Sequence, residues 1–246
     1  MAEARYDAVA DFYISGFDSA DDPVCVTLLD LLGNVTGRRI LDVACGHGRV
    51  TRELARRGAA QVTGIDISGC LINRAVEIEK KDPLGITYIH ADLTAPDALP
   101  GARFDAATCH FGLSDIDDLD TAIATISQAL QPGGAFVFAV LHPCFAGGKD
   151  IAGSWPTAAS YYDEGRWTAQ DIRSTLRRQV GSNHRMLSTY LGTLRKHGFW
   201  LEELLEPTPE PGWDPAHDAD RHPVFLAARA VLGPPTPTTA SPQRTT

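Results

Sequence analysis

The chain has 246 residues, a length typical of one domain, and 43% of them are hydrophobic, as in globular proteins. Its 22 Lys and Arg residues against 31 Asp and Glu give a formal net charge of −9 at pH 7, which disfavours nucleic acid as a partner. The five cysteines include no CxxC pair, so we expect neither a disulfide framework nor structural zinc, as in a cytoplasmic protein. The acidic start argues against a signal peptide, and the lack of any apolar run of about 18 residues argues against a membrane partner.

Strand-like apolar runs alternate with helical patterns along the chain, which is typical of a parallel sheet wound by helices. The pattern predicts strands at 39–44, 61–66, 86–91, 104–110 and 135–142, with helices at 47–57, 68–80 and 119–130 between them. A helical face runs from Leu187 to Leu194, and two late strands are predicted at 199–205 and 223–231. We therefore expect an α/β fold with a doubly wound sheet.

Two segments depart from this alternation. The connection after the fifth strand is rich in aromatic residues and too long for a turn, so we expect 143–185 to form a loop or lid over a binding site. The stretch 233–246 is mostly Pro and Thr and is expected to be a disordered tail. Excluding this tail, we expect residues 1–232 to form a single domain.

The most informative segment is the first strand, which runs into the turn Gly46-His47-Gly48 and then into a helix. Glycines in such a turn let the backbone approach a ligand closely. A dinucleotide-binding turn has a third glycine where this chain has Thr51, so pyrophosphate binding is disfavoured. Asp42 just before the turn would repel a phosphate and attract an ammonium group.

Carboxylates also end the next two strands. Asp66 follows Gly46 by twenty residues, where an acid can accept both hydroxyls of a ribose. Asp92-Leu93 closes the third strand, where a carboxylate and an apolar neighbour could hold an adenine. Together these positions describe a nucleoside that carries a cation instead of a pyrophosphate.

With these residues, and with a Leu130-Gln131-Pro132-Gly133-Gly134 turn before the fifth strand, the chain resembles the class I, small-molecule S-adenosylmethionine-dependent methyltransferases from about residue 6 to 231. The resemblance implies a Rossmann-like seven-strand sheet of order 3-2-1-4-5-7-6, with 223–231 antiparallel, and S-adenosyl-L-methionine as cofactor. It also implies an N-terminal helical lid within 1–35, although Tyr6 and Tyr13 could equally belong to an ordinary helix. The cofactor-binding residues expected on this basis are Tyr13, Asp42, Ala44, Gly46, Gly48, Asp66, Ile67, Asp92, Leu93, Cys109 and His110.

The acceptor should bind at the loops after the fourth and fifth strands, because ligands of open parallel sheets lie beyond the carboxyl ends of the strands. His142 and His184 are candidate catalytic bases, each with a purely structural role as the alternative. Aromatic side chains could form a flat substrate pocket or simply pack a lid; the candidates are Phe111, Phe145, Tyr161, Tyr162 and Trp167. The acidic run 115–120 is expected to be a solvated helix start, and no metal is predicted.

We therefore predict methyl transfer from S-adenosyl-L-methionine to a small organic acceptor, aromatic or amine-bearing, by in-line displacement with a possible histidine base. Two alternatives stay open. One is a nicotinamide-dependent oxidoreductase built on the same sheet. The other is a protein of methyltransferase fold with a non-methylating role, as a cyclase or a scaffold.

Overall fold

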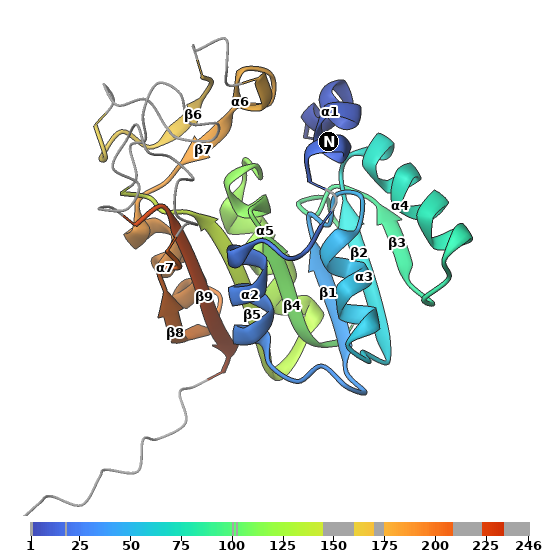
Figure 1. The fold of residues 1–246 in the computed structure, drawn as a ribbon. Coiled ribbons are helices and arrows are strands. Elements are labelled where there is room, and N and C mark those ends of the chain that lie inside the picture. Colours follow the sequence, from blue (N-terminus) through green and yellow to red (C-terminus); the bar gives the residue numbers. More distant parts are fainter. Residues whose placement is uncertain are drawn as a thin grey trace, which may run out of the picture.

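A computed structural model of the chain describes residues 2–17, 19–99, 101, 103–144, 160–169, 175–208 and 223–233. Its centre is a seven-stranded sheet (Figure 1). In sheet order the strands are β3 (Thr87–His90), β2 (Gln61–Asp66), β1 (Arg39–Val43), β4 (Phe104–His110), β5 (Leu130–Leu141), β9 (Phe225–Leu232) and β8 (Phe199–Leu205). The first five run parallel, and β9 is antiparallel to both of its neighbours. The expected order 3-2-1-4-5-7-6 is confirmed.

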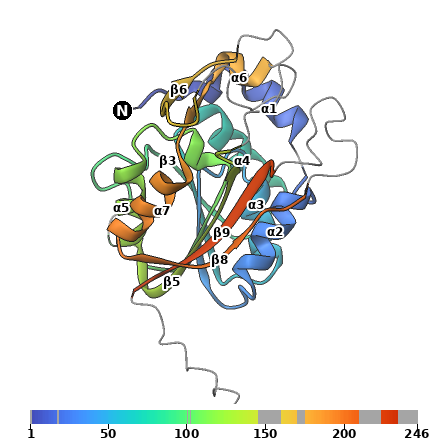
Figure 2. The ribbon, with the colours of Figure 1, turned by 90° about the vertical axis from the view of Figure 1, so that its left-hand side faces the viewer.

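Helices cover both faces of this sheet (Figure 2). On one face lie α2 (Pro23–Leu32) and α3 (Arg49–Arg56), and on the other α5 (Leu119–Ala129) and α7 (Leu187–Lys196). Helix α4 (Gly69–Lys81) contacts β2 and β3 at the edge. The helices begin where local chemistry favours it: the Asp22, Ser68 and Asp118 side chains each accept a hydrogen bond from a backbone N–H of the first turn.

The central strand β5 shows how the sequence fills both layers. Phe136 and Phe138 pack with the α5 and α7 residues, whereas Ala135 and Val137 pack with α2 and α3. Successive side chains of a strand point to opposite faces, so a strand buried on both sides is apolar throughout. This explains the unbroken hydrophobic run that predicts it.

A third layer lies above the carboxyl ends of the parallel strands (Figure 1). It contains the N-terminal helices η1 (Arg5–Val9) and α1 (Ala10–Gly16), the two-stranded sheet of β6 (Gly165–Trp167) and β7 (Ser182–His184), and α6 (Thr175–Gln179). The short helix η2 (Gly112–Ser114) follows β4. Within the expected lid 1–35, therefore, only η1 and α1 lie above the sheet, whereas α2 packs on its face through buried Val24, Leu28 and Leu32.

Parts of the two irregular segments fall outside the described residues. The expected insertion is described at 143–144, 160–169 and 175–185, so Phe145 is not placed, and the expected tail is described only at Gly233. Among the described helices, none combines the length and apolar character needed to cross a bilayer.

Candidate active site

A cavity of about 860 Å³ extends along the carboxyl edge of the sheet, within the size range of small-ligand sites. Its lining follows the order of the strands. Asp92 and Leu93 lie beyond β3, Asp66 and Ile67 at β2, Ala44 and Gly46 beyond β1, His110 and Phe111 at β4, and Leu141 and Phe225 at β5 and β9. Each parallel strand thus delivers residues to one continuous site.

The turn after β1 has an unusual backbone. Ala44, Gly46 and Gly48 have φ angles of 52°, 57° and 86°, a left-handed region that glycine adopts without strain. A Cβ on Gly46 would lie 3.4 Å from the Tyr13 ring, so the turn and α1 approach each other closely. The turn therefore presents bare backbone to the middle of the cavity.

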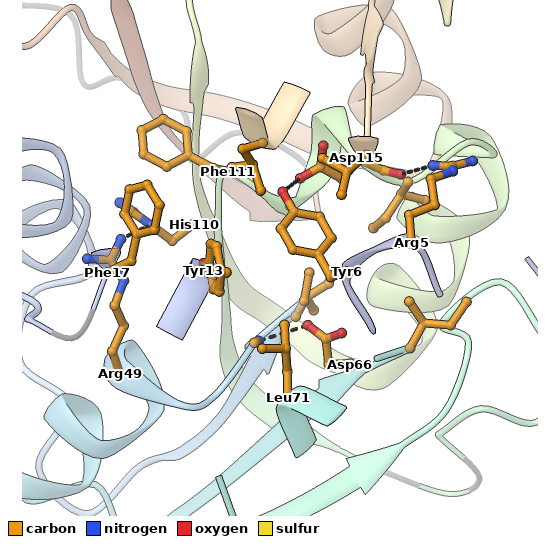
Figure 3. Close-up of a pocket in the computed structure, with 18 of the residues that line it drawn as sticks. Arg5, Tyr6, Tyr13, Phe17, Arg49, Asp66, Leu71, His110, Phe111 and Asp115 are labelled. Carbon is orange, nitrogen blue, oxygen red and sulfur yellow. Dashed lines mark hydrogen bonds between the residues drawn. The ribbon is translucent and has the colours of Figure 1, made fainter. Parts of the chain in front are cut away.

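Asp66 holds this turn in place (Figure 3). One carboxylate oxygen accepts from the Gly46 N–H at 2.8 Å, and the other accepts from the Ser68 N–H at 2.8 Å. Burial raises the pKa of Asp66 above its usual range. Each oxygen keeps a further lone pair for a ligand hydroxyl.

Asp92 occupies the β3 end of the cavity beside Ala91 and Leu93. It accepts hydrogen bonds from Thr94 at 2.6 and 2.9 Å and from the Ala2 N–H at 2.8 Å. Burial alone would raise its pKa, but these hydrogen bonds lower it below the ordinary value. The carboxylate is therefore ionised and within reach of a nitrogen donor.

Three residues expected at the cofactor lie elsewhere. Asp42 is buried behind the turn, accepts from the hydroxyls of Thr51 at 2.6 Å and Thr108 at 2.9 Å, and does not line the cavity. Burial raises the pKa of Asp42 to about 6. Gly48 is the N-cap residue of α3 and does not line the cavity, and Cys109 is fully buried in the core. Their positions fit a role in bracing the site, whereas Tyr13, Ala44, Gly46, Asp66, Ile67, Asp92, Leu93 and His110 all line it.

The roof of the cavity depends on contacts that the sequence pattern does not reveal. Asp115 accepts from the Tyr6 hydroxyl at 2.7 Å and pairs with Arg177 of α6 at 2.5 Å. Asp117 pairs with Arg5 of η1. The expectation of a solvated acidic helix start is therefore wrong for Asp115, which is partly buried. Asp117 is exposed as expected, although its partner Arg5 lies far away in sequence. The expectation of a helix start holds for Asp118, which follows them and caps α5.

At the β4 end, three polar side chains form a connected group. The Arg49 guanidinium donates to Asp22 at 2.8 Å and to Nδ1 of His110 at 2.9 Å. Burial lowers the pKa of His110, so the ring is neutral at pH 7. Asp22, Cys25 and His110 are close enough to share a metal ion, but the Arg49 guanidinium already supplies positive charge there.

The two histidines expected to be catalytic bases do not line this cavity. His142 is 4% exposed, accepts from the Cys144 N–H at 3.1 Å through Nδ1, and has Nε2 2.9 Å from Glu206. His184 lies in β7 with Nε2 2.9 Å from the carbonyl oxygen of Tyr161. Both rings are engaged by the protein.

The aromatic residues expected to bind substrate are divided in the same way. Phe111 lines the cavity, whereas Tyr161, Tyr162 and Trp167 do not. The Tyr161 hydroxyl accepts from the Leu187 N–H at 3.0 Å, Tyr162 is 77% exposed, and Trp167 pairs with Ser182 between β6 and β7. These contacts fit the alternative in which Tyr161, Tyr162 and Trp167 pack a lid and do not bind substrate.

Comparison with known proteins identifies the family. A family model for a methyltransferase domain matches residues 40–134. The crystal structure of an S-adenosylmethionine-dependent methyltransferase from Mesorhizobium loti is 31% identical, with a TM-score of 0.68 over 86% of this chain and 98% of that one. A structure described as a putative S-adenosylmethionine-dependent methyltransferase from Listeria monocytogenes is 27% identical, with a TM-score of 0.69 over 85% and 97%.

A curated relative, the ubiquinone biosynthesis O-methyltransferase of Alkalilimnicola ehrlichii, is 37% identical over 113 residues, 45% of this chain and 44% of that one. The chain thus aligns with about half the length of such relatives. It belongs to the class I S-adenosylmethionine-dependent methyltransferases of the small-molecule type. The resemblance seen in the sequence is confirmed, and S-adenosyl-L-methionine is the methyl donor.

The described residues fit this cofactor. Gly46 leaves the space that a side chain would fill, and Asp66 presents a half-buried carboxylate to the middle of the cavity. The Ala2 N–H bound to Asp92 shows that this carboxylate accepts from a nitrogen donor, as it would from an adenine amino group.

Proposed function

We propose that the protein methylates a small aromatic or amine-bearing acceptor at the β4, β5 and β9 end of the cavity. The observation that carries the proposal is the continuity of this cavity from Asp92 to Phe225. The end of the cavity at Asp92 suits the cofactor, and the end at Phe225 has aromatic walls. A single site can therefore hold donor and acceptor side by side.

In this arrangement Asp92 and Leu93 hold adenine, Asp66 holds the ribose hydroxyls, and the backbone at Ala44 and Gly46 holds the methionine portion. Bound S-adenosyl-L-methionine supplies an electrophilic methyl group on a sulfonium. The support from the structure is that these residues line the cavity in that order along the sheet edge. The residues at the β4 end would then adjoin the methionine portion, which carries the methyl group.

The protein contributes mainly alignment and exclusion of water. Tyr6 and Tyr13, whose rings pack edge to face at 5.2 Å, roof the cavity, and the Asp115–Arg177 pair anchors Tyr6. Holding two reactants in line can supply a large part of the barrier reduction of a displacement, and closing the site protects the sulfonium from water. His142 and His184 stay candidate bases only if the acceptor reaches beyond the described lining.

Calorimetric titration with S-adenosyl-L-methionine and S-adenosyl-L-homocysteine tests the cofactor part, with NADH and NADPH as controls. We expect binding of the first pair only. Incubation with methyl-labelled cofactor and a panel of phenols, amines and indoles then tests transfer. Binding without label in any acceptor would favour the cyclase or scaffold role, and binding of a nicotinamide alone would refute the assignment.

A further inference from the structure

The cavity is roofed in part by an N-terminal strap, which we define as residues 2–7, and most of these residues line it. The strap begins at Ala2, whose N–H donates to the Asp92 carboxylate at 2.8 Å. It ends at Asp7, which accepts from the Ser68 hydroxyl at 2.5 Å. The strap therefore lies against the walls of the cavity that the proposed function assigns to the cofactor.

The middle of the strap is held by the segment that follows β4. The Tyr6 hydroxyl donates to one carboxylate oxygen of Asp115 at 2.7 Å (Figure 3). Arg5 pairs with Asp117 and also donates to the carbonyl oxygen of Asp115 at 3.3 Å. These contacts join only protein groups, so they can form whether or not a ligand is bound.

The other oxygen of the same carboxylate is held from a distant part of the chain. Nη1 of Arg177, in α6 of the insertion, donates to it at 2.5 Å and to the Gly181 carbonyl at 2.9 Å. The side chains of Arg177 and Asp115 are only 7% and 20% exposed. Breaking such a pair is costly because it leaves a largely buried charge without compensation. Arg177 therefore fixes the carboxylate that fixes the strap.

The insertion also grips the backbone around this carboxylate. The Asn183 side chain donates to the Ser114 carbonyl at 3.2 Å, and Arg185 donates to the carbonyls of Leu113 at 2.8 Å and Ile116 at 2.5 Å. Both donor side chains are buried. The segment after β4 is thus a common support, with the strap on one side and the insertion on the other.

The position of these elements gives the contacts a consequence for binding. Ligands of open parallel sheets lie outside the carboxyl ends of the strands. The strap and α6 belong to the layer above those ends (Figure 1). A cofactor must therefore enter and leave through this layer, and lid opening of this kind often limits the release of product.

We propose that Arg177 is a positioning residue that locks the strap over the cofactor through Asp115 and Tyr6, and that this lock sets how fast S-adenosyl-L-methionine enters and S-adenosyl-L-homocysteine leaves. The inference rests on the proposed function, which places the cofactor beneath the strap. It gives the insertion a second role, because a segment expected to cover the acceptor also governs the exchange of the donor.

The test measures binding kinetics on the full chain with S-adenosyl-L-homocysteine as the probe. Mixing protein with labelled ligand gives the association rate constant, and a chase with excess unlabelled ligand gives the dissociation rate constant. Arg177→Met removes the donors and keeps an apolar stem, and Tyr6→Phe removes only the hydroxyl. The matched control is Arg178→Met, since Arg178 is an exposed neighbour in the same helix that does not line the cavity.

A lock has a distinctive kinetic signature. Arg177→Met should raise the association and the dissociation rate constants together, each about tenfold, the factor for one hydrogen bond, so that the dissociation constant changes less than threefold. Tyr6→Phe should do the same. Because both side chains act through Asp115, the double variant should be no faster than the faster single variant. Arg177→Lys, which can still pair with the carboxylate, should recover part of the slow exchange, and Arg178→Met should match the wild type.

Three results would overturn the inference. The first is unchanged rate constants in Arg177→Met. The second is a rise in the dissociation rate constant alone with a matching loss of affinity, which would mean that Arg177 contacts the ligand directly. The third is a double variant whose effect is the product of the two single effects. If melting curves show that Arg177→Met does not fold, Arg177→Lys and Tyr6→Phe are judged by the same criteria. Failure of the wild type to bind S-adenosyl-L-homocysteine would instead refute the proposed function, so the two failures are distinguishable.

Discussion

Replacing Asp66 with asparagine is the sharpest perturbation of the cofactor site, because it removes the charge and preserves the shape. In the wild type both carboxylate oxygens accept backbone N–H groups, from Gly46 and from Ser68, each at 2.8 Å. An asparagine has only one oxygen, so its NH₂ group must face one of these two N–H donors. The substitution therefore disturbs the turn and the ribose contacts together.

The two effects have different magnitudes. A buried donor that loses its acceptor costs about 1–3 kcal/mol of folding stability. For the cofactor, hydrogen bonds from two hydroxyls to a charged group, about 1.5–3 kcal/mol each, are replaced by neutral ones of about 0.5–1.5 kcal/mol. The difference corresponds to roughly 2–3 kcal/mol, or about 30- to 150-fold in the dissociation constant.

Calorimetry with S-adenosyl-L-homocysteine and urea unfolding measure the two effects separately. Asp82→Asn is the matched control, since Asp82 is an exposed residue at the end of α4 that pairs with Arg56 away from the cavity. An Asp66→Asn protein that binds the ligand as tightly as the control would refute the ribose assignment, whatever its stability.

Three further changes test the surrounding structure. Burial raises the pKa of Asp42 from 3.8 to about 6, so the contribution of this group to the free energy of unfolding is full below pH 4 and is lost as pH rises through 6. In urea unfolding from pH 4 to 8, Asp42→Asn should remove this loss of stability, which is worth about 3 kcal/mol, and an unchanged dependence of stability on pH would contradict the argument. Gly112→Ala places a Cβ against that of Ala44 in the turn after β1 and should lower both the melting temperature and the affinity for the cofactor. The control Gly192→Ala in α7 places its Cβ in open space and should be neutral or stabilising, and equal melting temperatures for the two variants would refute the packing argument. His142→Ala should lower the melting temperature and leave turnover within about twofold, because both ring nitrogens of His142 contact protein groups. A hundredfold loss of turnover at unchanged stability would instead establish His142 as the base.

The parts of the site that could be predicted depend on local patterns. A glycine turn after a buried strand, and carboxylates at the ends of the next two strands, all lie within fifty residues, and Gly46, Asp66 and Asp92 line the cavity as expected. The strand boundaries of β2, β4 and β8 are confirmed to the residue, because each is a short apolar or alternating run between turn signals.

The parts that could not be predicted depend on contacts between distant segments. Asp115 meets Tyr6 across 109 residues and Arg177 across 62, and no periodicity links such positions. His142 illustrates a second difficulty, since the end of a strand is predictable but the direction of its last side chains is not. The His142 N–H pairs with the Val224 carbonyl at 2.8 Å, and the alternation along the strand brings Leu141, not His142, to the cavity.

The direction of β9 determines which residues line the far end of the cavity. Parallel strands deliver their last residues to the carboxyl edge, whereas an antiparallel strand delivers its first. Phe225 begins β9 and pairs with Leu141, which ends β5, so both residues line the same end of the cavity. A parallel strand in this place would bring Leu232 to that edge instead, and Phe111 would lose its ring partner. The reversed strand is therefore a source of cavity-lining residues that lie outside the cofactor motifs, which is why those motifs predict one end of the cavity and not the residues of its far end.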